Sequence, residues 1–93
     1  MDRQAFIDKL HAKLDEWNAE IDKLEAKANQ AKAEKQAEYR EEIQELKQKK
    51  QDAKNKLDEV KASSDAAWQD LKAGAEEAFE TMKEAFQSAR NKF

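Results

Sequence analysis

The stretch LDEWNAEIDKL, residues 14–24, places large apolar side chains at alternating intervals of three and four residues. These side chains share one helical face, as in a heptad seam, and are Leu14, Trp17, Ile21 and Leu24. The same stripe extends from Leu10 to Phe93, with a member about every 3.6 residues, which is the turn of an α-helix. The sequence therefore predicts an all-α coiled-coil rod.

The composition agrees with long helices. The 93 residues include no proline, no cysteine and one glycine, Gly74, and 42% of them are charged. The absence of cysteine excludes disulfides, and the net charge of −3 is too mild to favour nucleic acid or an anionic membrane. We expect neither a signal peptide nor a membrane span, since charged residues interrupt every apolar run, and the default location is the cytoplasm.

The first predicted helix covers residues 3–62. Its segment NQAKAEKQAE, residues 29–38, lacks large apolar side chains but consists almost entirely of residues that are neutral or favourable in a helix. Leu14 and Ile43 lie 29 residues apart, two 11-residue repeats and a heptad, so the face stays in register through this segment. Asn29 is the one plausible turn point, and a turn there would give a three-helix bundle instead.

A break is predicted near residues 63–65, because Ser63, Ser64 and Asp65 precede a new apolar run, as helix N-caps do. The second predicted helix, residues 65–92, carries an 11-residue repeat in which Trp68 aligns with Phe79. The whole chain, 1–93, is expected to be one helical coiled-coil domain with the second helix folded back antiparallel on the first.

The second helix has the most hydrophobic face of the chain, and its large side chains are Trp68, Leu71, Phe79, Met82, Phe86 and Phe93. Two environments fit this face. It can close a hairpin on the distal half of the first helix, or lie on a membrane surface. Six acidic against four basic residues in this segment disfavour anionic lipid.

Self-association follows from the seam of the first helix, whose members are Leu14, Trp17, Ile21, Leu24, Ile43, Leu46, Leu57 and Val60. In a hairpin, the proximal part of this seam, together with Phe6 and Ile7, would have no cover from its own chain. Each buried Leu or Ile is worth about 1.5–3 kcal/mol, so we expect a homo-oligomer, a dimer or higher. Lys50, within the seam, is a candidate for setting register.

No catalytic, cofactor or metal site is predicted, and no small-molecule substrate. His11 has Asp8 and Asp15 on its own helical face, but a solvated surface histidine is the preferred interpretation. The basic cluster is Lys47, Lys49, Lys50, Lys54 and Lys56. It has no aromatic residue for base stacking, so nucleic acid is an unexpected partner.

Three segments resemble a family of small coiled-coil stress-response proteins of cyanobacteria and proteobacteria: LDEWNAEIDKL (14–24), YREEIQEL (39–46) and AWQDLKAG (67–74). The resemblance implies induction under stress and brings no catalytic residues. A weaker one, to the 11-residue repeats of apolipoproteins, rests on the C-terminal helix. The expected function is a non-enzymatic, self-associating structural or interaction protein, and the alternative is a protein that binds lipid surfaces through residues 65–93.

Overall fold

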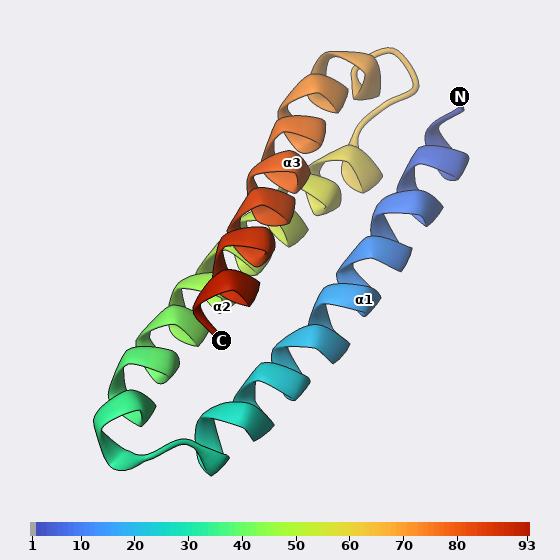
Figure 1. Ribbon diagram of the computed structural model, residues 1–93. Helices are drawn as coiled ribbons and strands as arrows, with labels where there is room; N and C mark the ends of the chain where they lie inside the picture. The colour runs from blue at the N-terminus through green and yellow to red at the C-terminus, as the bar shows by residue number, and fades with distance from the viewer. Residues whose placement is uncertain (1) are drawn as a thin grey trace.

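The computed structural model describes residues 2–93, which form three helices: α1 (Arg3–Gln30), α2 (Ala33–Ala62) and α3 (Trp68–Lys92). Each helix reverses the direction of the one before it, so α1 and α3 run parallel and α2 runs opposite to both (Figure 1). The bundle is elongated, 52 × 19 × 17 Å. The all-α prediction is confirmed, and the arrangement is the three-helix bundle that was the alternative from sequence.

The single helix predicted over residues 3–62 is wrong at Ala31 and Lys32, which separate α1 from α2. Both residues are extended, with φ −74° and ψ 157° at Ala31 and φ −63° and ψ 150° at Lys32. The turn thus lies just beyond Asn29. The physical reason is tertiary: folding α1 back onto α2 buries a seam that a straight helix would leave in water, and packing outweighs local propensity in most helices.

The break predicted near residues 63–65 is confirmed, and α3 begins at Trp68 after a short turn. The hydroxyl of Ser63 donates to the Val60 carbonyl at 2.6 Å, which satisfies an acceptor at the end of α2. The hydroxyl of Ser64 accepts from the Ala67 amide at 3.1 Å and so supports the turn into α3. Serine side chains therefore build this junction.

One cluster of apolar side chains runs along the whole bundle axis. Its buried members are Phe6, Ile7, Leu10, Leu14, Trp17, Ile21, Leu24, Ala28, Ile43, Leu46, Ala53, Leu57, Val60, Trp68, Ala75, Phe79, Met82, Phe86 and Ala89. Ala53 and Ala75 have no exposed surface, and such small residues allow helices to approach closely. The backbones of α1 and α3 each pack along α2 and come close to one another at very few points.

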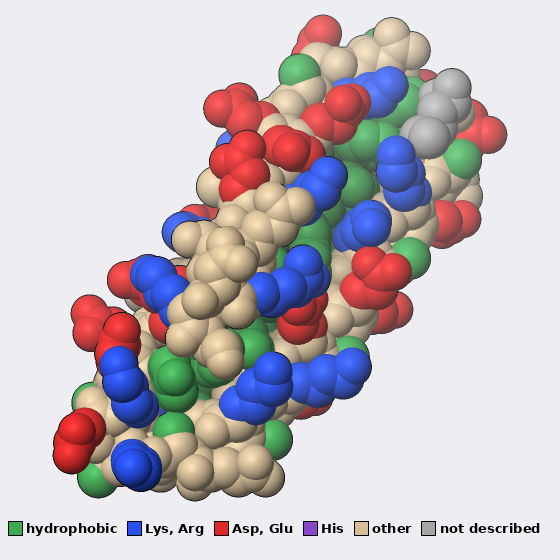
Figure 2. All heavy atoms as spheres, in the orientation of Figure 1, with side chains coloured by type: hydrophobic (Ala, Val, Ile, Leu, Met, Phe, Trp, Pro, Cys, Tyr) green, Lys and Arg blue, Asp and Glu red, His purple; other side chains and the backbone are tan. Residues whose placement is uncertain are grey.

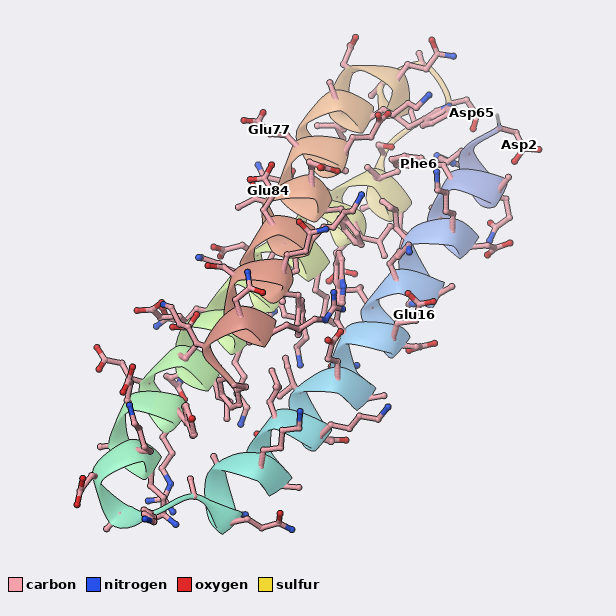
Figure 3. The ribbon with its side chains drawn as sticks, viewed as in Figure 1. Asp2, Phe6, Glu16, Asp65, Glu77 and Glu84 are labelled. Atoms are coloured by element: carbon pink, nitrogen blue, oxygen red, sulfur yellow. The ribbon has the colours of Figure 1, made fainter. Side chains whose placement is uncertain are left out.

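The N-terminal end of α1 is attached to the α2–α3 junction. Asp2 caps the helix, since its carboxylate accepts from the Ala5 amide at 2.7 Å. Arg3 donates to the Ser63 carbonyl and pairs with the Asp65 carboxylate at 3.1 Å. Asp2 and Asp65 lie at the same end of the bundle in Figure 3. These contacts hold the first turn of α1 against the start of the turn into α3.

Candidate functional site

The candidate site is the side of the bundle on which α1 and α3 face each other. The two helices are joined there by aromatic rings rather than by close backbone packing. Trp17 of α1 lies 5.3 Å from Phe79 and 5.8 Å from Phe86, between ring centroids, with the second pair nearly parallel. Phe6 and Trp68 make a third such contact at 5.9 Å. Large rings act as spacers, so the backbones of α1 and α3 stay apart.

This separation leaves an open groove of about 600 Å³. Its apolar floor consists of Phe6, Leu10, Trp17, Phe79 and Phe86. Its walls carry the cations Lys9, Lys13, Lys72, Lys83 and Arg90 and the anions Glu16, Glu20, Glu76 and Glu80. Figure 2 shows the apolar floor between the two helices, with Lys and Arg side chains along its edges. In Figure 3, Glu77 and Glu84 extend from α3 away from this side.

Charged contacts cross the groove and line its walls. The Arg90 guanidinium forms a forked ion pair with the Glu20 carboxylate, and its Nη2 lies 2.7 Å from Oε2. The hydrogen bond to Glu20 raises the pKa of Arg90, although burial acts in the opposite direction. Lys72 places its ammonium 5.8 Å from the centre of the Phe6 ring, a cation–π distance. Within residues 2–93, Lys9 and Lys83 form no ion pair, so these two exposed cations remain free for a ligand.

The eight seam residues predicted for self-association all lie in the core of the single chain. The prediction that Leu14 to Leu24, Phe6 and Ile7 lack intramolecular cover is wrong, because these side chains lie in one buried cluster to which α2 and α3 also contribute. Trp17, for example, is 6% exposed and touches two rings of α3. The sequence predicted that the apolar face of α3 packs on α2. It did not predict that the same face of α3 also contacts α1.

The face predicted for a hairpin or for lipid packs inside the protein. Trp68, Phe79, Met82 and Phe86 are buried, and Leu71 and Phe93 are half-buried against the core. Phe93 stacks on Tyr39 of α2 with ring centroids 4.3 Å apart, as an antiparallel hairpin requires. No helix within residues 2–93 is long and apolar enough to cross a membrane.

The end of α3 is fixed on α2 by charge as well. Lys92 donates to the Glu42 carboxylate at 3.0 Å. That hydrogen bond, with the negative charge of Glu42, raises the pKa of Lys92. The ammonium is exposed, so this pair positions the last turn of α3 and adds little stability.

Polar residues singled out from the sequence lie on the α1–α2 side. The His11 ring contacts Lys61 at 3.2 Å, and no group of metal-ligating residues occurs within residues 2–93. Lys50, in the seam, donates to Asn18 of α1 at 2.6 Å, so it links the two helices while its ammonium stays at the surface. Of the basic cluster, Lys47 pairs with Glu25 at 2.6 Å, which also joins α1 to α2.

Sequence analysis missed the groove because it requires knowing that α1 and α3 are neighbours. One signal pointed toward it. Lys72 and Lys83 lie 11 residues apart, beside the aromatic arc of the second helix, and both line the groove. No family model, curated protein or solved structure matches this chain.

Proposed function

We propose that this protein is a non-enzymatic helical structural and interaction protein of the cytoplasm that self-associates. The observation that supports this function is the groove between α1 and α3, where aromatic rings and the Arg90–Glu20 ion pair replace close backbone packing. A helix of a second copy carries the same apolar face and can compete for this surface. Protection under stress, which the family resemblance implies, belongs to the same proposal.

Self-association is tested by the mass of the protein in solution. We expect multi-angle light scattering after size-exclusion chromatography to give 10.8 kDa at micromolar concentration and a mass rising toward twice that value at millimolar concentration. The reason is mass action on a surface that each copy offers to another. A constant mass of one chain across this range would remove self-association from the proposed function.

Binding to an anionic lipid surface is a second candidate, and one observation favours it. Among the described residues, the groove combines an aromatic floor with two unpaired cations, Lys9 and Lys83, against one unpaired anion, Glu80, and this balance of apolar and positive groups suits an anionic amphiphile. The α1–α3 side is also where the bundle has the fewest backbone contacts, so it is the side on which apolar rings are most readily uncovered.

Vesicle flotation tests this candidate. We expect the wild type to float with anionic vesicles and to stay at the bottom with neutral ones, because the two free cations attract the headgroups. The double variant Lys9→Glu with Lys83→Glu should lose flotation, and both positions are exposed, so the fold is retained. Lys23→Glu with Lys49→Glu changes the same charge at exposed sites outside the groove. If the wild type floats with neither vesicle, or the control pair behaves like the groove pair, the lipid candidate is excluded.

A further inference from the structure

We infer that two copies of this chain associate by exchanging α1. The break at Ala31 and Lys32 straightens, residues 3–62 of each copy become one helix, and each α1 occupies the place on its partner's α2 and α3 that the partner's own α1 has left. The inference rests on the proposed self-association and specifies how it is built.

The backbone of the break needs little change for this exchange. Ala31 and Lys32 have ordinary φ values of −74° and −63°, close to those of a helix, and only their ψ values, 157° and 150°, are extended. No described residue of the chain has a positive φ, so no residue holds the turn through a conformation that a helix cannot share. Rotation about ψ at two residues joins α1 to α2.

The two residues of the break, Ala31 and Lys32, have a high intrinsic propensity for the α-helix. Alanine and lysine are among the best helix formers, and Lys32, the N-cap residue of α2, makes no side-chain capping hydrogen bond. In a continuous helix the Asn29 carbonyl would accept from the Ala33 amide. Here the side-chain amide of Gln36 replaces it at 3.2 Å. The α2–α3 junction differs, because Ser63 and Ser64 stabilise it through their hydroxyls.

The register of the apolar face permits a straight helix. Leu14 and Ile43 are separated by 29 residues, about eight turns of a helix, so they return to the same side when α1 and α2 are joined. Two such helices, packed antiparallel, would bring each α1 against an α2 as in the single chain. The face that α1 presents to its own α2 is therefore the face that the exchanged dimer needs.

Apart from the hydrogen bonds at the break itself, the contacts that α1 makes with α2 and α3 in the single chain are formed again between copies. The Trp17–Phe79 and Trp17–Phe86 contacts, the Arg90–Glu20 pair and the Arg3–Asp65 pair all become intermolecular. The two states then differ mainly in the break, where the dimer has the continuous helix and the monomer has the larger chain entropy. Short connections of this kind favour domain swapping.

Ala33→Pro tests the role of the break at Ala31 and Lys32, since proline at position 33 is compatible with the monomer and incompatible with the continuous helix of the exchanged dimer. In the monomer, position 33 is the first residue of α2, where proline is favoured, and Lys32 before it already has the extended backbone that proline requires. In the continuous helix the ring would clash with the Asn29 carbonyl. We expect unchanged helicity by circular dichroism, a higher melting temperature, and dimerisation weakened by about a hundredfold or more.

Cross-linking distinguishes exchange from docking of closed monomers. The chain has no cysteine, so Glu25→Cys with Lys47→Cys introduces thiols on facing turns of α1 and α2, at positions whose native side chains pair at 2.6 Å. A short bis-maleimide is added at millimolar protein concentration, where the dimer is expected to be populated. Exchange predicts covalent dimers on a denaturing gel, and docking predicts cross-links within single chains. In the Ala33→Pro background the cross-link should lie within the chain.

The outcomes separate this inference from the proposed function. Cross-links confined to single chains in a genuine dimer, or a dimer of the Ala33→Pro variant as tight as that of the wild type, overturn α1 exchange and leave self-association intact. Lys9→Glu with Lys83→Glu provides the converse control, because exchange predicts an unchanged dimer whereas docking in the groove predicts its loss. A wild type that remains at 10.8 kDa at millimolar concentration overturns both proposals.

Discussion

Replacing Trp17 with alanine is expected to lower the free energy of unfolding by about 3–5 kcal/mol, the range for deleting a buried large aromatic side chain. Trp17 is 6% exposed and its ring contacts both Phe79 and Phe86, so it is the main link between α1 and α3. Its removal leaves a cavity at the centre of the interface that has the least backbone packing. A bundle of this size has a total stability of about 5–15 kcal/mol, so the variant should be close to unfolding.

Urea denaturation followed by far-ultraviolet circular dichroism measures this loss at micromolar concentration, where the monomer should dominate. Lys23→Ala, at an exposed position of the same helix, is the matched control and should change stability by less than about 0.5 kcal/mol. A loss below about 1 kcal/mol at Trp17 would contradict the observed packing of α1 on α3, since a tryptophan deleted from a real core costs more than that.

Leu46→Ala is expected to lower the free energy of unfolding by about 2–5 kcal/mol. Leu46, on α2, is 1% exposed and is among the largest side chains that are fully buried. Because α2 is the helix against which both others pack, neighbouring side chains have little freedom to fill the void. The variant should retain its helices and melt at a lower temperature.

Thermal and urea unfolding of Leu46→Ala should be compared with Lys49→Ala, an exposed position about one turn further along α2. The alanine at position 49 also has a good helix propensity, so the comparison isolates core packing from helix formation. Equal stability of the two variants would be incompatible with Leu46 as a core residue. A normal denaturant dependence in both variants would show that cooperative unfolding is preserved.

The helical character, the core residues and the second turn could all be predicted from the sequence. The spacing of Leu14, Trp17 and Ile21 depends on the pitch of a single helix, so no knowledge of neighbours is needed to assign their face. The junction at Ser63 and Ser64 was also predictable, because serine hydroxyls compete locally for backbone hydrogen bonds, and the structure contains those bonds.

The groove could not be predicted in the same way. Lys9 and Lys83 lie 74 positions apart in the sequence, and each looks like an ordinary solvated lysine on its own helix. They line one groove because α3 packs across α1 as well as α2, with Trp17 between two phenylalanines. The predicted hairpin paired the C-terminal helix only with the α2 part of the first helix and left out its contact with α1. The seam of α1, from Leu14 to Leu24, was therefore expected to be uncovered, although the structure buries it.

By itself, the sequence determined which side chains are hidden and that helices hide them, since periodicity and propensity are local properties. Only the tertiary structure decided where the first helix ends. Ala31 and Lys32 suit either a helical or an extended backbone, and the extended one lets the apolar face of α1 pack on the chain's own α2 and α3. The choice between them depends on burial and chain entropy over the whole molecule, which no short stretch of residues encodes.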